Sequence, residues 1–435
     1  MQLVPTLDLF PLLAAVLAAI TCGLLGNFLV LRRLSLMGDA ISHSVLPGIV
    51  VAFLVFSTRS PLPMLLGAGI AGVLTVMLVE VVRRVGGVEP SAAIGVVFSL
   101  MFALGVLLLE GAAESRVDLD PDCVLHGQLE SLAWFGGPET WRGVLSPATL
   151  EALPRQVWML LAVCAISLAV VTVLFKELRL AAFDPSLATA LGFDARILHV
   201  VLMTLVAAAA VACFEAVGSI LVVAMLVCPA ATARLLTDRL PSQLLASVLV
   251  ALAAAVLGYL AATMLPALVG LPSVNAAGSI ATVAGFLLVV AVVAAPEHGL
   301  IARAWRRRRV ARETAGEDLL AALYRARESG LDAVQLSSLP PALALRNLEP
   351  ILRQVTNRGW VERREGTLRL TTGGLAEASA LVRRHRLWET YLVDEAGLAP
   401  DHVHETAERL EHAPIAIDLD AATDPQGKRI PPQTE

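Results

Sequence analysis

The chain has 435 residues, of which 57% are hydrophobic and only 16% are charged, and its mean hydropathy is +0.73. This composition excludes a single soluble globular domain and indicates a membrane protein. The net charge of -5 is too small to indicate a partner. Charged residues become frequent only from about Arg303 onward, so we expect a soluble region after the membrane part.

Apolar segments long enough to cross a bilayer dominate the first 300 or so residues. A membrane-spanning helix needs ~20 apolar residues. Nine segments meet that requirement: 8–31, 37–57, 62–82, 91–110, 156–176, 197–213, 216–233, 242–264 and 276–295. The sequence therefore predicts a mostly α protein that begins with a polytopic bundle of about nine transmembrane spans.

Basic residues predict the orientation of these spans. Every second connection is basic: Arg32 and Arg33, Arg83 and Arg84, Lys176 and Arg179, Arg234 and Arg239, and "RAWRRRR" at 303–309. By the positive-inside rule these connections face the cytoplasm. We therefore expect a multi-pass protein of the cell (inner) membrane with an extracytoplasmic N-terminus and a cytoplasmic C-terminal region.

The second span opens with "GDAISHSVLPG", in which Asp39 and His43 lie four residues apart. Residues at i and i+4 project from the same side of a helix. An ionisable residue inside a span is costly unless it is paired or hydrated. The pair therefore indicates either an ion path, or a hydrogen-bonded or hydrated pair near the interface. The following Pro47 can also open the helix and expose backbone carbonyls.

The connection after the fifth span contains a second unusual segment, "FDPSLATALGFDARI" at 183–197. It is rich in polar and small residues, and Asp184 followed by Pro185 is typical of a helix start. We expect a short helix that lies across the cytoplasmic surface of the membrane and is presented to a partner.

Four separated motifs carry a family resemblance over about residues 8–303. They are "MGDAISHSVLPGIVVAF", "FDPSLATALGF", "AVGSILVVAMLVCPAATARLLTDRL" at 216–240 and "PEHGLIAR" at 296–303. The chain resembles the ABC-type permeases for manganese, zinc and iron. The resemblance implies a homodimeric or heterodimeric permease in the lipid bilayer, which receives a divalent metal from an extracytoplasmic binding protein.

The same resemblance implies roles for particular residues. It places Asp39 and His43 on the metal path. It also implies that a cytoplasmic ATPase docks on the second motif, at Asp184, Pro185, Leu187, Leu191, Gly192 and Phe193. The chain has no GxxxxGK(S/T) phosphate loop, so we expect it to bind no nucleotide and to be a transport subunit rather than an enzyme.

Behind the basic run, residues 316–374 show the pattern of a winged helix. An amphipathic helix over 316–330 is followed by a further helix, a turn at Gly359 and a β-hairpin that turns at "REG". Many such domains bind DNA, and arginines here supply positive charge: Arg346, Arg353, Arg358, Arg363, Arg364 and Arg369. Glu349, Glu362 and Glu365 dilute that charge, so DNA and protein both remain open as partners.

Histidines and acids recur at helical spacing in the segment that follows. They are His385 and Glu389 on one helix, and His404, Glu408, Glu411 and His412 on the next. Six oxygen and nitrogen ligands from adjacent helices suit a hard or borderline divalent cation. The alternative is a solvated helix face with ion pairs.

This region resembles the metal-binding and dimerisation domain of diphtheria-toxin-repressor-type and manganese-repressor-type regulators. The resemblance covers about residues 316–414 and implies metal ligands at those six positions, with Glu408 where iron-type members carry cysteine. Asp318 falls where a ligand from the first helix is expected. Manganese, iron and zinc all remain open as the metal.

The expected domains are a permease at 1–303, a basic linker at 304–315, a winged helix at 316–374, a helical metal-binding and dimerisation domain at 375–414, and a tail at 415–435. We therefore expect the permease of an ATP-driven divalent metal importer with a fused cytoplasmic metal sensor. A membrane-tethered, metal-dependent transcription regulator is the main alternative. A siderophore or cobalamin permease is disfavoured, because such ligands do not need Asp39 and His43.

Overall fold

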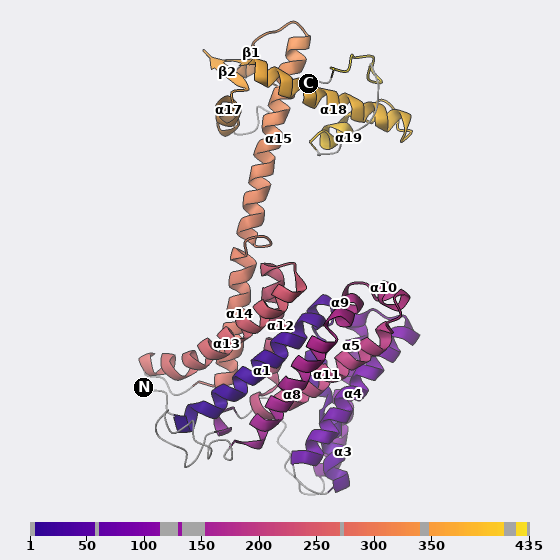
Figure 1. Ribbon diagram of the computed structural model, residues 1–435, viewed down its shortest axis with the longest axis vertical. Helices are drawn as coiled ribbons and strands as arrows, with labels where there is room; N and C mark the ends of the chain where they lie inside the picture. The colour runs from indigo at the N-terminus through magenta and orange to yellow at the C-terminus, as the bar shows by residue number, and fades with distance from the viewer. Residues whose placement is uncertain are drawn as a thin grey trace. The chain divides into compact units, whose positions relative to one another are not determined.

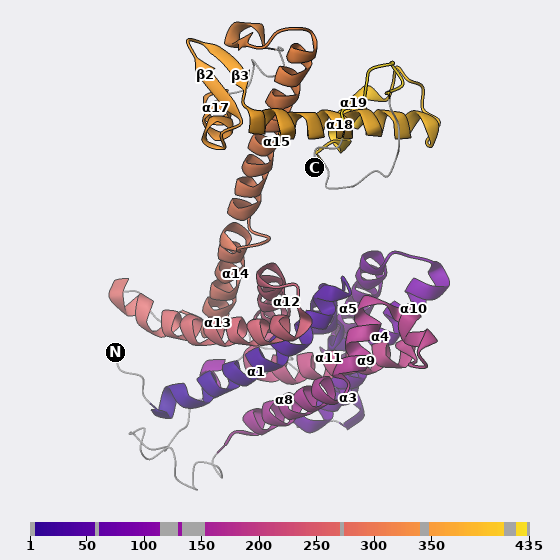
Figure 2. The same ribbon diagram turned by 45° about the horizontal axis from the view of Figure 1, so that its top comes forward.

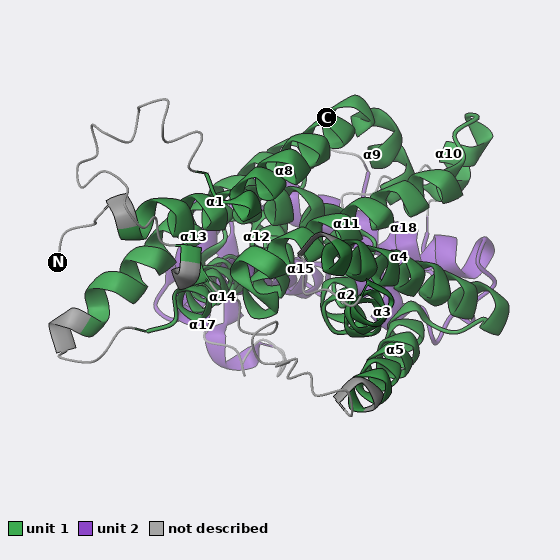
Figure 3. Ribbon diagram, turned by 90° about the horizontal axis from the view of Figure 1, so that it is seen from below, with its two compact units in different colours: residues 1–302 green, residues 303–435 purple. Residues whose placement is uncertain are grey.

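The computed structural model describes residues 5–56, 61–113, 129–132, 153–269, 274–339, 348–412 and 423–432. The chain divides into two compact units, which are residues 1–302 and residues 303–435 (Figure 3). Each unit is described separately.

Unit 1 is a bundle of helices, and its described residues contain nine segments long and apolar enough to cross a membrane (Figure 1). The expected number of spans is therefore confirmed. The helices are α1 (Pro5–Leu31), α2 (Met37–Ser44), α3 (Leu46–Phe56), α4 (Pro61–Gly86), α5 (Pro90–Ala113), α8 (Arg155–Val173), α9 (Phe175–Phe183), α10 (Pro185–Ala190), α11 (Ala195–Val217), α12 (Ser219–Leu236), α13 (Leu240–Val269) and α14 (Ala276–Ala294), with a 3-10 turn at Leu129–Leu132.

The second span consists of two helices, α2 and α3, which are separated at Val45. Pro47 lies in the first turn of α3 and has no backbone N–H. In a continuous helix that N–H would bond to the carbonyl of His43, four residues earlier. Proline therefore leaves the carbonyl oxygen of His43 without its helical hydrogen-bond donor. His43 also carries a candidate metal-ligating imidazole.

Small residues allow close contact between the helices of unit 1. A Cβ at Gly48 of α3 would lie 2.1 Å from the carbonyl oxygen of Gly67 in α4. Helices α1 and α11 are the most enclosed spans, because 72% and 67% of the residues in their apolar stretches are buried. The end of the second span that carries α2 therefore packs in the interior of the bundle, against α4, α5, α11 and α12.

Unit 2 combines helices with a small antiparallel sheet whose strand order is β1-β3-β2. Its elements are α15 (Leu300–Glu328, which begins two residues before the end of unit 1), β1 (Val334–Gln335), a 3-10 turn (Leu336–Ser338), α17 (Leu348–Asn357), β2 (Val361–Arg364), β3 (Thr367–Leu370), α18 (Thr372–Asp394) and α19 (His404–Leu410).

The hairpin turns at Glu365 and Gly366, both with positive φ, at the expected "REG". A two-residue turn of this kind matches the twist of the paired strands. Apolar side chains of α15, α17 and β3 form the core beneath the sheet, including Leu319, Leu352 and Leu368. The described elements thus have the outline of a winged helix, while residues 340–347, including Arg346, lie outside the described residues.

The basic segment at 304–315, which we expected to be a linker, is helical and belongs to α15. It contains no proline or glycine, and its arginines and alanines have high helix propensity. A helix therefore runs without interruption from the end of the permease sequence into the first helix of unit 2.

The last described segment, residues 423–432, is held to α18 by Arg386, of which only 4% is exposed. Arg386 donates to Glu328 of α15, with Nη2 2.7 Å from Oε2, and to the carbonyl of Arg429. Its Nε also lies 3.6 Å from Oδ2 of the buried Asp424. Residues near both ends of unit 2 are thus joined through one buried guanidinium.

Candidate metal centres

The first candidate centre is the pair in α2. The Nε2 atom of His43 lies 3.6 Å from Oδ1 of Asp39, and the two side chains are 29% and 49% exposed, respectively. The imidazole makes edge contacts with Phe98 and Phe102 of α5. Met37, Ala40 and Ile41, which lie on the other faces of the same helix, are buried. Both ligand atoms therefore lie on the one side of α2 that the bundle leaves partly open.

The pair is an incomplete ligand set. In the part of the chain that the structure describes, no third histidine, cysteine or carboxylate joins Asp39 and His43 in a cluster of three. Protein sites for transition metals have at least four ligands. Two side chains that are half open leave room for water or for ligands from another molecule.

The second candidate centre lies in unit 2 and contains His385, Glu389 and His404, whose ligand atoms lie within 4.8 Å of one another. Atom Nε2 of His385 is 3.2 Å from Oε1 of Glu389, and Nδ1 of His404 is 2.8 Å from the same oxygen. His385 and Glu389 are one turn apart on α18, which places both on one face. His404 begins α19 and closes the cluster from the opposite side.

A third group lies next to it and contains Asp318, Glu411 and His412. Atom Nε2 of His412 is 3.2 Å from Oδ1 of Asp318, and its Nδ1 is 2.5 Å from Oε2 of Glu317. The sequence analysis missed Glu317. Its position beside Asp318 in an acidic pair was a usable signal, but only the packing of α15 against the end of α19 shows that both acids reach one imidazole.

The two groups are joined, because Nδ1 of His385 donates to Oε2 of the buried Glu411. Burial lowers the pKa of His385, but its hydrogen bonds with Glu389 and Glu411 outweigh burial and leave the pKa above its ordinary value. Hydrogen bonds with Asp318 and Glu317 raise the pKa of His412 to about 10. A metal at these nitrogen atoms would therefore compete with protons.

The donor set fits a divalent cation. Carboxylate oxygens and imidazole nitrogens are the ligands that manganese, iron and zinc share. The acids are drawn from α15, α18 and the end of α19, and Glu389 and Glu411 are each 2% exposed. Burying charged groups so completely costs free energy unless they are paired. Here each buried acid is paired with a histidine, and the double cluster is a candidate metal site.

Glu408 differs from the expectation, since it belongs to neither cluster of described residues and its side chain is exposed. The expected single face of α19 is split because His404 and Glu411 meet α18, whereas Glu408 lies on the solvent side. Helical spacing alone did not reveal this, because a seven-residue helix followed by a turn does not keep one face.

Asp238, Glu297 and His298 form another cluster, at the ends of α12 and α14. Asp238 already pairs with Arg234 at 2.9 Å and with His298 at 3.0 Å, and it is exposed. Asp238 therefore already has two side-chain partners, Arg234 and His298.

The expected ATPase contact folds as a short helix, α10. The side chain of Asp184 accepts a hydrogen bond from the backbone N–H of Leu187 at 2.9 Å and so caps the helix. Gly192 has a φ of 89° and ends it. Leu187 and Leu191 are 46% and 60% exposed and lie on one short helix and its C-cap.

Phe193 differs from these two leucines, because it packs back against Ala188 and Leu198. Phe183, which the sequence analysis did not select, is 58% exposed at the other end of the segment. The exposed large apolar side chains of segment 183–197 are therefore Phe183, Leu187, Leu191 and Ile197.

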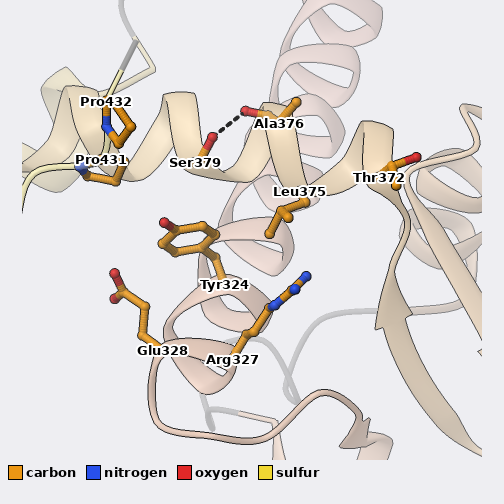
Figure 4. A pocket seen from close by; sticks show the side chains of 9 residues that line it. All are labelled: Tyr324, Arg327, Glu328, Thr372, Leu375, Ala376, Ser379, Pro431 and Pro432. Carbon is orange, nitrogen blue, oxygen red and sulfur yellow. Dashed lines mark hydrogen bonds between the residues drawn. The ribbon is translucent and has the colours of Figure 1, made fainter. Parts of the chain in front are cut away.

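A cavity of about 570 Å³ in unit 2 lies away from the metal clusters. Figure 4 shows it between α15, α18 and the C-terminal segment, with the ring of Tyr324 on one side and Pro431 and Pro432 on another. Its lining contains none of the clustered histidines: it is formed by Tyr324, Arg327, Glu328, Thr372, Leu375, Ala376, Ser379, Pro431 and Pro432.

The arginines that suggested DNA binding are partly neutralised. Arg353 and Arg363 both pair with Glu349, at 3.5 and 3.0 Å, and Arg364 pairs with Glu362 at 3.5 Å. These carboxylates compete with phosphate for the same guanidinium groups. The geometry thus gives no support to DNA as a partner.

Two family models match the chain. The model described as "ABC 3 transport family" matches residues 9–133 and 148–295. The model described as "Iron dependent repressor, metal binding and dimerisation domain" matches residues 371–414, the segment that holds His385, Glu389, His404, Glu411 and His412.

Several proteins are similar to this chain. The manganese transport system membrane protein MntD of Bacillus subtilis (strain 168) is 38% identical over 301 residues, which are 69% of this chain and 96% of that protein. The zinc transport system membrane protein TroD of Treponema pallidum (strain Nichols) is 34% identical over 377 residues, 85% of this chain and 97% of that protein. Among solved structures, PsaBC from Streptococcus pneumoniae in complex with Fab has a TM-score of 0.52 and 29% identity, over 67% of this chain and 92% of that one.

Proposed function

We propose that this chain, which belongs to the ABC 3 transport family, is the multi-pass membrane permease of an ATP-driven importer of divalent metal ions and carries its own cytoplasmic metal sensor. The observation that carries the proposal is the double ligand cluster of unit 2, which lies in the same chain as a permease bundle. Manganese and zinc are named for its relatives, and the oxygen and nitrogen ligands accept both, as well as iron.

Asp39 and His43 form the part of the transport path that this chain supplies. Their open side leaves room for further ligands, and a second permease subunit, identical or related, is the natural source of these ligands. Pro47 has no N–H to donate to the carbonyl of His43, so we include this oxygen as a candidate further ligand. An incomplete set binds metal weakly enough to release it, as transport requires.

The remaining components follow from the same arrangement. An extracytoplasmic metal-binding protein delivers the ion at the N-terminal side of the membrane. A separate cytoplasmic ATPase docks on α10, with Leu187 and Leu191 as apolar anchors and Asp184, Pro185, Gly192 and Phe193 shaping the helix that presents them. The basic connections place unit 2 on the same cytoplasmic side.

The sensor is proposed to reduce transport when internal metal is high. Its ligands come from α15, α18 and α19, so metal binding ties these three helices together. Helix α15 is also continuous with the end of the permease sequence. A metal-dependent restraint on α15 is therefore a direct way to act on the permease.

The test is uptake of radioactive manganese, and separately of zinc, by vesicles that contain the chain, its ATPase and the binding protein. Internal metal is preloaded at increasing concentrations. We expect uptake by the unmodified chain to fall with preloading and uptake by Glu411→Ala/His412→Ala to stay constant. Equal inhibition of both would contradict the sensor role, and absence of metal uptake by the complete transporter would contradict the permease role.

A further inference from the structure

Arginines surround a cavity of about 380 Å³ at the end of unit 1 where α1 and α4 finish and α11 begins. Ala181 and Ala182 of α9 and Pro185 of α10 line one side of it. Helices α9 and α10 lie beside α11 (Figure 2). The lining residues come from three separate parts of the sequence, which are the end of α1 with the turn after it, the end of α4, and the consecutive helices α9 to α11: Leu31, Arg32, Arg33, Leu34, Arg83, Arg84, Ala181, Ala182, Pro185, Ala195, Arg196 and His199.

Arg32 is the central residue of this cavity. Its Nη1 donates to Nδ1 of His199 at 2.7 Å. Its Nε and Nη2 are buried and have no hydrogen-bond partner among the described residues. These two nitrogens form one edge of the planar guanidinium, and that edge binds two oxygens of one oxyanion side by side. A buried donor pair without an acceptor is costly and indicates a missing ligand.

The carboxylate within reach is already used. Glu80 accepts from Nη2 of Arg83 at 2.8 Å and from Nε of Arg84, and it faces Nε2 of His199 at 3.5 Å. Because arginine can only donate, Nδ1 of His199 is the acceptor and this imidazole is neutral. Five arginines and one glutamate leave an excess of four positive charges around the cavity.

Arg33 adds a further observation. Its φ is 59°, the left-handed conformation that closes α1, with the N–H of Leu34 bonded to the carbonyl of Leu29 at 2.8 Å. Glycine normally occupies this position because it adopts that conformation without strain. An arginine there costs stability, and its charge at the cavity is a reason to keep it.

We propose that this cavity binds a phosphate group, supplied either by an anionic lipid headgroup or by a soluble phosphate compound. The one carboxylate of Glu80 does not balance five arginines, whereas a phosphate offers several oxygens to the free edge of Arg32 and to Arg33 and Arg196. The site goes beyond the proposed transport function, and it lies beside Pro185, which begins the segment proposed to meet the ATPase.

The test measures thermal unfolding of the purified full chain in neutral detergent, with increasing inorganic phosphate against sodium chloride of equal ionic strength. A ligand that binds only the folded state raises the unfolding midpoint. Arg32→Lys keeps the charge but lacks the two-nitrogen edge, and we expect its apparent phosphate affinity to fall at least about tenfold.

Two further variants keep the test decisive. Arg33→Gly removes a charge and relieves the left-handed backbone, so we expect it to fold at least as well as the unmodified chain and to bind phosphate more weakly. Arg179→Lys is the matched control, because Arg179 is an exposed arginine of α9 that does not line the cavity. Its response to phosphate should equal that of the unmodified chain.

Nanodiscs distinguish the two sources of phosphate. For a lipid headgroup, phosphatidylglycerol in phosphatidylcholine discs should raise the midpoint and abolish the response to added phosphate; for a soluble ligand, the response should persist in both discs. An equal response of all variants, or none at all, would overturn the proposal. It would also be wrong if phosphate had no effect while Arg32→Lys lost co-purification with the ATPase, since the cavity would then hold a carboxylate of that partner.

Discussion

The two candidate metal centres differ in how completely this chain builds them. In α2, two ligands one turn apart stand on a partly open helix face, and Asp39 is 49% exposed. In unit 2, Glu389 and Glu411 are each 2% exposed, and their partners come from three helices.

This difference agrees with the two roles proposed above. The proposed transport role needs an ion that leaves quickly, which few ligands from one chain allow, whereas the proposed sensor role is served by a more complete ligand set. Burial of the unit 2 cluster is tolerated because each carboxylate faces an imidazole. The α2 pair avoids that cost by staying open.

The largest expected effect is on the complete centre. Glu411→Gln/His412→Ala removes ligands from both joined groups, and we expect manganese affinity of unit 2 to fall by roughly 100-fold or more, since even supporting residues of metal sites contribute 10 to 100-fold. Calorimetric titration of the purified full chain measures this. His402→Ala, at an exposed histidine outside the clusters, should bind metal normally; unchanged affinity of the double variant would contradict the assignment.

A substitution in the α2 pair should change the rate of metal uptake rather than the metal affinity at equilibrium. Asp39→Asn keeps the size of the side chain but removes its charge, and we expect metal uptake to fall about tenfold or more. Asp194→Asn is the control, because asparagine caps a helix as well as aspartate does and Asp194 caps α11. Wild-type uptake by Asp39→Asn would remove Asp39 from the path.

A third change tests whether the permease depends on close packing behind the pair. Gly48→Ala places a methyl group against the backbone of Gly67, and we expect a loss of about 1–3 kcal/mol in the free energy of unfolding of unit 1. Manganese affinity of unit 2 should not change. Gly69→Ala meets no atom within 4 Å and should be neutral or stabilising; an equal loss in both variants would argue against the packing explanation.

The smallest effect is expected at α10. Asp184→Ala removes the cap of this helix and costs about 1 kcal/mol of local stability. Metal-stimulated ATP hydrolysis should fall modestly, whereas Asp184→Asn should retain it because the cap is restored. Metal binding to unit 2 should be identical in both, and a full rate in the alanine variant would show that the cap is not needed for coupling.

Local patterns were enough to predict much of the fold. Apolar runs gave nine spans, and "REG" gave the hairpin, because both depend on neighbouring residues. The contact between His412 and Glu317 depends on the packing of α15 against the end of α19, and no local sequence pattern predicts that packing. The continuity of α15 was missed because a run of arginines reads as a linker although its residues favour helix. The cavity at Arg32 joins three separate parts of the sequence, around residues 31–34, 83–84 and 181–199, so no local pattern predicts it either.

The buried Arg386 sets a limit on how the chain can be shortened. The repressor-family match ends at residue 414, but two of the groups that contact this guanidinium, Asp424 and the carbonyl of Arg429, come later. A version cut at residue 414 would keep every clustered metal ligand and yet leave a charged donor facing the gap that the missing segment had filled. For expression, tagging or domain exchange, the metal-binding region therefore extends to about residue 432.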